Sequence, residues 1–131
     1  MSTDQSNPYL FRGLLCAIAV IGLILTVFLC LYIANRNKVF DAAVNGTVED
    51  VKFFIERGVS VNAKNSNGSS LIHYATMNPN VEVLKFLVEK GADVNAKDNN
   101  GWTPLDFASG KKEMEDLLRE VGAKYGKELR E

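Results

Sequence analysis

The chain has 131 residues and a formal net charge of −1, so its length allows one small domain and one additional element. Residues 35–131 alone contain 14 Lys and Arg and 15 Asp and Glu, and this balance predicts no electrostatic footprint for nucleic acid or for acidic lipid. The two cysteines, Cys16 and Cys30, both lie in an apolar segment, which excludes a disulfide framework and a cysteine-based zinc site.

The first predicted element is a helix over residues 13–34, preceded by an N-terminal tail over residues 1–12. The helical segment carries no charged side chain. It is roughly 33 Å long at about 1.5 Å per residue, which matches the hydrocarbon core of a bilayer. It is apolar on all sides, and Tyr9, Phe11 and Tyr32 lie near its ends, where interfacial aromatic side chains are common. We therefore predict a single transmembrane helix in contact with the lipid bilayer.

A cleaved signal peptide is the alternative interpretation of this segment. The apolar run is longer than the usual core of a signal peptide, and Tyr32 stands where a small residue would be needed for cleavage after Ala34. Arg36, Lys38 and Lys52 give the C-terminal side more positive charge than the N-terminal side. By the positive-inside rule, this difference favours a single-pass membrane protein whose following domain lies on the cytoplasmic side.

Small side chains recur every four residues within the apolar segment, at Gly22, Thr26, Cys30 and Ala34. Small residues at this spacing allow two membrane helices to approach closely, so the pattern is compatible with a weak homo-oligomer. Small residues are also frequent in membrane helices in general. The sequence therefore leaves both interpretations open.

The rest of the chain contains an internal repeat with a period of 33 residues. When residues 48–68 are shifted by 33 positions onto residues 81–101, 12 of the 21 positions are identical. The shared residues include the tract Val-Asn-Ala-Lys at 61–64 and 94–97. A fixed period of this length is the signature of a repeat protein, in which successive units stack on one another.

Each repeat unit is predicted to form two short helices joined by turns. Residues 48–55 and 81–88 place apolar side chains at helical spacing. Gly58 and Gly91 follow these segments, where a left-handed closing residue is least costly as glycine. The Thr-Pro pair at 103–104 supplies an N-cap and a proline suited to the first helical position. The fold class is therefore all-α.

These motifs resemble the ankyrin repeat family. The resemblance rests on the period, on Gly-x-Thr-Pro-Leu at 101–105 and on Gly-Ala-Asp-Val-Asn-Ala-Lys-Asp at 91–98. It implies an ankyrin-type stack of about three helix-turn-helix repeats, preceded by the transmembrane helix. The predicted boundaries are a short linker at 35–38, a repeat domain at 39–124 with units at about 35–67, 68–100 and 101–124, and a C-terminal tail at 125–131.

The units depart from the family pattern in ways that indicate capping repeats. Residues 35–38 stand where the first unit would carry its turn, and the charged segment 111–120 makes the last helix polar. His73 is the only histidine, and the resemblance implies a structural hydrogen-bonding role for it. Asp106 replaces the corresponding histidine in the third unit, and Asn78 is followed by proline where the family has glycine.

The resemblance also implies a protein-binding function, because ankyrin stacks bind folded proteins through a concave groove and a row of hairpin tips. Trp102 occupies an implied groove position, and tryptophan is a frequent binding anchor. Covering the apolar edge of the second unit is the alternative role for Trp102, and turn geometry alone also accounts for the tip residues. The residues predicted to contact a partner are Trp102, Met77, Ser69, Lys64, Asn65, Lys97, Asp98 and Asn99.

No catalytic residue, metal or cofactor is expected. Gly-x-x-x-Gly-Lys at 122–127 resembles a phosphate loop, but one residue is missing between the glycines and no Ser or Thr follows the lysine. His73 has no second histidine with which to hold a metal ion, and the chain contains no nucleophile–base constellation. The sequence therefore favours a binding protein over an enzyme.

The leading hypothesis is a membrane-anchored protein–protein interaction module. Only residues 35–38 separate the apolar segment from the first repeat helix, so the partner is expected to be another membrane-associated protein. The alternative is a small structural subunit of a membrane complex that is recognised through its transmembrane helix. Replacing residues 13–34 by an unrelated apolar helix distinguishes the two, because only the first hypothesis predicts that partner binding is retained.

Overall fold

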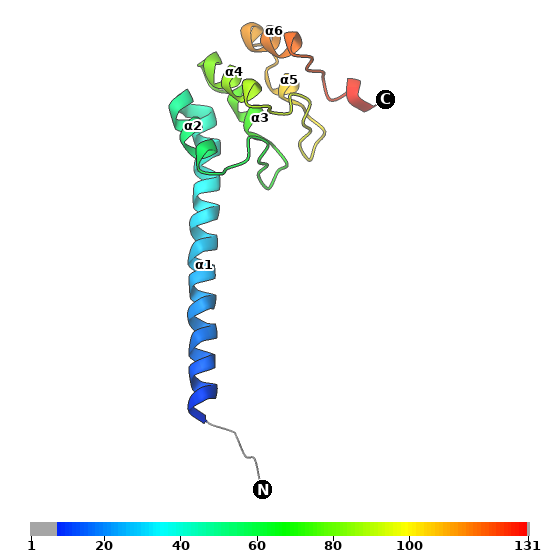
Figure 1. Ribbon diagram of the computed structural model, residues 1–131. Coiled ribbons are helices and arrows are strands. Elements are labelled where there is room, and N and C mark those ends of the chain that lie inside the picture. Colours follow the sequence, from blue (N-terminus) through cyan, green and yellow to red (C-terminus); the bar gives the residue numbers. More distant parts are fainter. Residues whose placement is uncertain (1–7, 131) are drawn as a thin grey trace. The chain divides into compact units, whose positions relative to one another are not determined.

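The computed structural model describes residues 8–130 and divides them into two units, one ending at Ala34 and the other beginning at Asn35. Within the described residues, the regular secondary structure is helical, and one isolated bridge joins Lys64 to Ser70. Figure 1 shows one long helix and a set of short helix pairs. This arrangement confirms the all-α fold class.

The first helix, α1, extends over Pro8–Asn45. Every residue from Pro8 to Asn35 is exposed. Residues 35–38, which were expected to form a linker, are helical and continue α1 into the second unit. No glycine or proline interrupts this stretch, and the residues after it are held by packing, since Val39 and Ala43 are fully buried in the core of the second unit.

Within residues 8–130, five further α-helices form three helix pairs with the end of α1, and one 3-10 helix comes last (Figure 1). The first helices of the second and third pairs contact each other, and so do the second helices of neighbouring pairs. The second unit is therefore a stack of helix pairs in two layers. The helices are α2 (Val48–Glu56), α3 (Leu71–Ala75), α4 (Val81–Glu89), α5 (Pro104–Phe107), α6 (Lys112–Glu120) and η1 (Glu128–Arg130).

The ends of these helices follow the local signals in the sequence. Thr103 is the N-cap of α5, with Pro104 at its start, as predicted. Gly58 and Gly91 have φ values of 93° and 84°, which confirms the left-handed closing residues after α2 and α4. Thr47 caps α2, and its backbone N–H donates to the Asp50 carboxylate at 2.8 Å.

The centre of the stack is α4, which contacts α2, α3 and α6. Val83, Leu84 and Leu87 lie on its inner face and are fully buried. They belong to one continuous apolar core that includes residues from all three helix pairs. A stack of only three pairs has a small apolar core, because each unit buries its apolar face only against its neighbours.

The C-terminal segment belongs to the stack rather than forming a separate tail beyond residue 124. Tyr125 packs against the core, with the Arg119 and Lys127 cations 5.1 and 5.4 Å from its ring. Gly126 is buried, and its backbone N–H donates to the Asp106 carboxylate at 2.9 Å. A Cβ atom at this position would collide with the Gly101 carbonyl oxygen, so only glycine fits.

Candidate binding surface

Two asparagines connect successive turns of the stack. The Asn62 side chain donates to the Gly91 carbonyl at 3.4 Å and accepts from the Asp93 backbone N–H at 2.8 Å. Asn95 makes the same pair of hydrogen bonds with the segment after α6, at 3.2 and 2.8 Å. These bonds fix the turns relative to one another, so the hairpins that precede α3 and α5 project side by side.

His73 connects the start of α3 to the hairpin that precedes α5. Its Nδ1 atom accepts from the Ser70 backbone N–H at 3.1 Å and lies 2.8 Å from the Ser70 hydroxyl. Its Nε2 atom lies 3.1 Å from the Trp102 carbonyl oxygen. The network therefore assigns the proton to Nε2, which donates to that carbonyl. The histidine is fully buried, and this geometry matches the structural role expected for it.

Acid should weaken the stack through His73. Burial lowers the pKa of His73 below its ordinary value of 6.5, although the hydrogen bond to the Trp102 carbonyl opposes the shift. The unfolded chain then takes up the proton first, so stability is fully present above pH 6.5 and is lost as the pH falls below that value. Urea unfolding between about pH 7.5 and about pH 5 should show this decline, and His73→Gln should reduce it. An unchanged slope in the variant would contradict the assignment.

Asp106 performs the equivalent function in the third unit. Its carboxylate accepts from the Thr103 backbone N–H at 2.8 Å and from the Gly126 N–H at 2.9 Å. Burial raises the pKa of Asp106, but these hydrogen bonds and that of the Thr103 hydroxyl outweigh it, so the pKa lies below the ordinary 3.8. The replacement of histidine by aspartate therefore preserves the connection between a helix start and the following turn.

Trp102 stands out among the predicted partner-binding residues. Its side chain is 55% exposed, although its backbone is held on both sides. The backbone N–H donates to the Asp98 carboxylate at 2.9 Å, and the carbonyl accepts from His73. The indole packs edge-on against Phe107, with ring centroids 6.1 Å apart, and Phe107 in turn packs against the His73 ring. The tryptophan is a large apolar side chain on a rigid support.

Met77 and Ser69 differ from each other in accessibility. Met77 follows α3 and is 38% exposed. Ser69 is only 5% exposed, and its backbone N–H donates to the Asn65 side chain at 3.0 Å. The Ser69 side chain therefore offers almost no surface to a partner, although it occupies the same place after a turn glycine as Trp102.

The predicted tip residues form two hairpins that contact each other. The Asn99 backbone N–H donates to the Asn67 carbonyl at 3.0 Å, and the Lys64 Nζ atom donates to the Lys97 carbonyl at 3.0 Å. Asn65 and Asp98 accept backbone N–H bonds within their own turns, as turn residues commonly do. We call the surface formed by these hairpins and Trp102 the hairpin face; Met77 lies beyond the opposite end of α3 and is not part of it.

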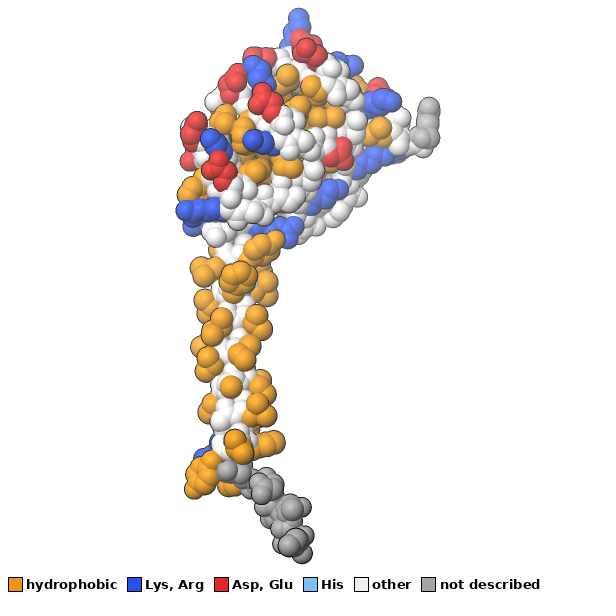
Figure 2. Space-filling model, viewed as in Figure 1, with side chains coloured by type: hydrophobic (Ala, Val, Ile, Leu, Met, Phe, Trp, Pro, Cys, Tyr) orange, Lys and Arg blue, Asp and Glu red, His pale blue; other side chains and the backbone are white. Residues whose placement is uncertain are grey.

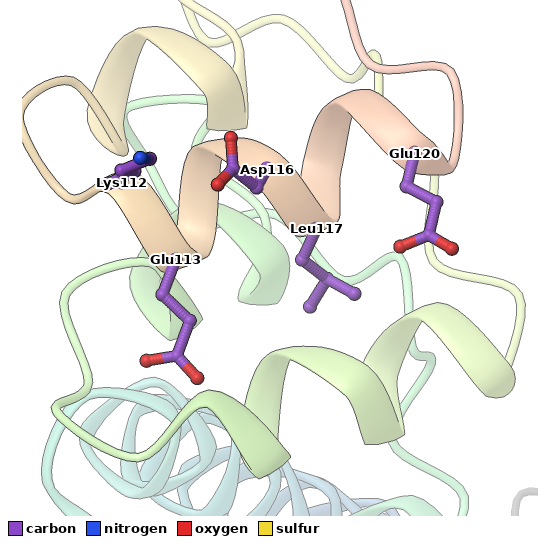
Figure 3. Close-up of a pocket in the computed structure, with 5 residues that line it drawn as sticks. All are labelled: Lys112, Glu113, Asp116, Leu117 and Glu120. Carbon is purple, nitrogen blue, oxygen red and sulfur yellow. The ribbon is translucent and has the colours of Figure 1, made fainter.

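A hollow of about 490 Å³ lies along α6, and no sequence motif indicated it. Figure 3 shows Glu113, Leu117 and Glu120 directed from α6 toward α4, whereas Lys112 and Asp116 point to the other side of the helix. The hollow is wide open, and it brings together carboxylates with no nucleophile or histidine. Within residues 8–130, no group of His, Cys, Asp and Glu side chains is arranged to hold a metal ion.

Stacked helix pairs, whose turns are joined by the same asparagine hydrogen bonds from one unit to the next, define a helical repeat protein. Residues 39–128, well over half of the chain, match the family model described as ankyrin repeats in three copies. The chain therefore belongs to the ankyrin repeat family, as its motifs predicted. A comparison with curated proteins finds no match.

Family membership establishes the general class of function. Ankyrin repeats generally mediate protein–protein interaction, and ankyrin repeat proteins are typically non-enzymatic. Among the described helices, α1 is long and apolar enough to cross a membrane, and a signal sequence near the N-terminus would meet the same criterion.

Proposed function

We propose that this chain is a single-pass membrane protein whose repeat domain binds a membrane-associated partner protein through the hairpin face. The observation that carries the proposal is the exposed indole of Trp102 on a rigid support. A large side chain that is already fixed loses little conformational entropy when a partner covers it. Tryptophan is also among the residues that most often dominate binding energy.

The membrane anchor is supported by the exposure of α1. Its apolar side chains, from Leu14 to Ile33, have no protein neighbours to bury them in the described structure. Exposing so many large apolar side chains to water is unfavourable by roughly 25 cal/mol for each Å². A lipid bilayer removes this cost, and the length of the helix fits the span. The positive charge after Ala34 favours the cytoplasmic side for the repeats.

Trp102→Ala is expected to lower the affinity for the partner about tenfold or more, because hot-spot tryptophans contribute at least this much. Folding stability should fall by about 0.5–1.5 kcal/mol, since the indole is 55% exposed and its packing is the edge-on contact with Phe107. Thermal unfolding followed by circular dichroism checks the fold, and co-purification from membranes checks the binding. Unchanged co-purification would remove Trp102 from the proposed surface.

A photoreactive amino acid at position 102, crosslinked in native membranes, identifies the partner directly. Phe53 provides a matched control, because it is an aromatic residue of similar exposure (46%) on α2. A crosslinked protein that appears from position 102 and is absent from position 53 supports the hairpin face. Equal adducts from both positions would indicate random encounters.

Extraction of the membranes at high pH tests the anchor, since a protein that spans the bilayer stays in the pellet.

Recognition through α1 is the second candidate, and the exposure of its small-residue stripe favours it. A Cβ atom added at Gly22 would meet no other atom within 4 Å, so this position leaves room for a second helix. The Thr26 hydroxyl donates to the Leu23 carbonyl at 2.8 Å and needs no external partner. A structural subunit held by this stripe would keep its partner when Trp102 is removed, and would lose it when the helix is replaced.

A further inference from the structure

Three cations, spaced 28 and 33 residues apart in the chain, are aligned by a repeated hydrogen bond. The Lys64 Nζ atom donates to the Lys97 carbonyl at 3.0 Å, and the Lys97 Nζ atom donates to the Leu129 carbonyl at 3.0 Å. Earlier in the chain, the Arg36 guanidinium donates to the Lys64 carbonyl. Each side chain thus reaches backbone that lies 28 to 33 residues further along the chain. We call Arg36, Lys64 and Lys97 the basic row.

The charges of the basic row are not neutralised by acidic side chains. The ion pairs of the described residues, 8–130, lie elsewhere: Lys52–Glu56 at 3.8 Å and Lys85–Glu82 at 2.7 Å, both on single helices. Asp98 follows Lys97 directly, but its carboxylate accepts the backbone N–H groups of Asn100 and Trp102 and is engaged in its own turn. Carbonyl partners position the cations and leave their full charge, so the row carries three fixed positive charges.

Additional basic side chains lie beyond the third unit. Arg130 lies on η1, and its guanidinium lies near Gly101 in the hairpin that precedes α5. Figure 2 shows Lys and Arg side chains gathered along one edge of the repeat domain, whereas acidic side chains are scattered over other parts of the visible face. The balanced composition therefore conceals a local positive edge. The overall charge balance gave no indication of this local edge.

We infer that the basic row binds the headgroups of anionic phospholipids in the membrane that anchors the chain. The inference rests on the proposed anchoring of α1. Arg36 follows the predicted span by two residues, so one end of the row lies at the membrane–water boundary when that segment is in the bilayer. Cations fixed in a line suit a flat layer of phosphates, to which basic side chains are attracted within about one Debye length.

The test uses the full chain in vesicles, with its single tryptophan as the reporter. Trp102 lies on the same hairpin as Lys97, because the Asp98 backbone N–H donates to the Trp102 carbonyl. Energy transfer from Trp102 to a headgroup-labelled lipid is measured in phosphatidylcholine vesicles and in vesicles that also contain phosphatidylserine. We expect higher transfer with phosphatidylserine. The increase should disappear in high salt, because the Debye length falls from about 10 Å at 0.1 M to about 3 Å at 1 M.

Charge-removing variants locate the effect. The triple variant Arg36→Gln, Lys64→Gln and Lys97→Gln keeps an amide donor at each position and should abolish the response to phosphatidylserine. The matched control Lys52→Gln, Lys90→Gln and Lys112→Gln removes the same charge from positions outside the row and should retain it. If the first variant unfolds, Arg36→Lys, Lys64→Arg and Lys97→Arg keeps the charge and must retain the response.

The outcomes separate this inference from the proposed function. Equal transfer in both vesicle types, or equal loss in both glutamine variants, overturns the lipid assignment. In that case an acidic protein surface becomes the occupant to test. Retention of the chain in phosphatidylcholine vesicles at high pH supports the membrane anchor, independently of whether the basic row binds lipid. Release under that treatment overturns the anchor and, with it, the inference.

Discussion

Leu87→Ala should lower the free energy of unfolding of the repeat domain by about 2–5 kcal/mol, which approaches the whole stability of a small domain. Leu87 is fully buried on α4, the helix that contacts α2, α3 and α6. Removing its side chain leaves a cavity at the centre of the stack, and the small core offers few other apolar contacts to offset the lost ones. Because the three units share one core, the loss should affect the domain as a whole.

Chemical unfolding of the full chain in detergent micelles, followed by Trp102 fluorescence, measures this effect without interference from α1. Met77→Ala is the control, because it removes a side chain of comparable size at a position that is 38% exposed. We expect the control to cost less than about 1 kcal/mol. A similar loss in both variants would contradict the central place of α4 in the core.

Asn78→Leu should cost about 2–4 kcal/mol, although it introduces a side chain of similar size that is apolar. The Asn78 amide is buried and donates to the Ala43 carbonyl at 3.1 Å and to the Gly46 carbonyl at 3.0 Å. Its oxygen accepts from the Asn80 backbone N–H at 2.8 Å. Leucine would leave these groups unpaired, and each buried unpaired group costs about 1–3 kcal/mol. The lost bonds also join the first unit to the second.

Two further variants test the explanation for Asn78. Asn78→Asp keeps the shape but removes both donors, so at neutral pH it should be at least as harmful as leucine. Asn45→Leu should have little effect, because the Asn45 amide is exposed and bonds only to the Asp41 side chain, at 2.9 Å. Thermal unfolding of the three variants provides the comparison. A mild effect of Asn78→Asp would show that the amide donors are not what holds the units together.

The repeat period and the ends of the helices were predictable because they depend on local chemistry. The cap at Thr103, the helix start at Pro104 and the turn at Gly91 follow from the chemistry of those residues and their immediate neighbours. The role of Asn78 was not predictable, since its partners are 32 and 35 residues away in the sequence. Only the stacking of one unit on the next brings these groups together.

The candidate surface was predictable in outline but not in detail. Ser69 and Trp102 occupy equivalent positions after a turn glycine, yet one is 5% and the other 55% exposed. A serine can be covered by its own hairpin, whereas an indole cannot. The basic row was not predictable for two other reasons. Arg36 lies outside the repeat that the sequence reveals, and the total charge does not indicate which cations become neighbours in the fold.

The helical continuity of α1 and the packing of the C-terminal segment have tertiary causes. Asn35 and Asn37 are weak helix formers, so local propensity favoured a linker. Burial of Val39 and Ala43 on the following turns supports the helix instead. Tyr125 similarly needs the third unit beneath it before its position is defined. Such effects depend on contacts that no short window of sequence contains.

We propose that the repeats, and not the apolar helix, recognise the partner. A chimera in which an unrelated apolar helix replaces residues 13–34 tests this, when the crosslinking from position 102 is repeated in native membranes. The chimera and the natural chain are expected to give the same crosslinked protein. Loss of that product, with the chimera still folded and still retained in the membrane, would assign recognition to α1.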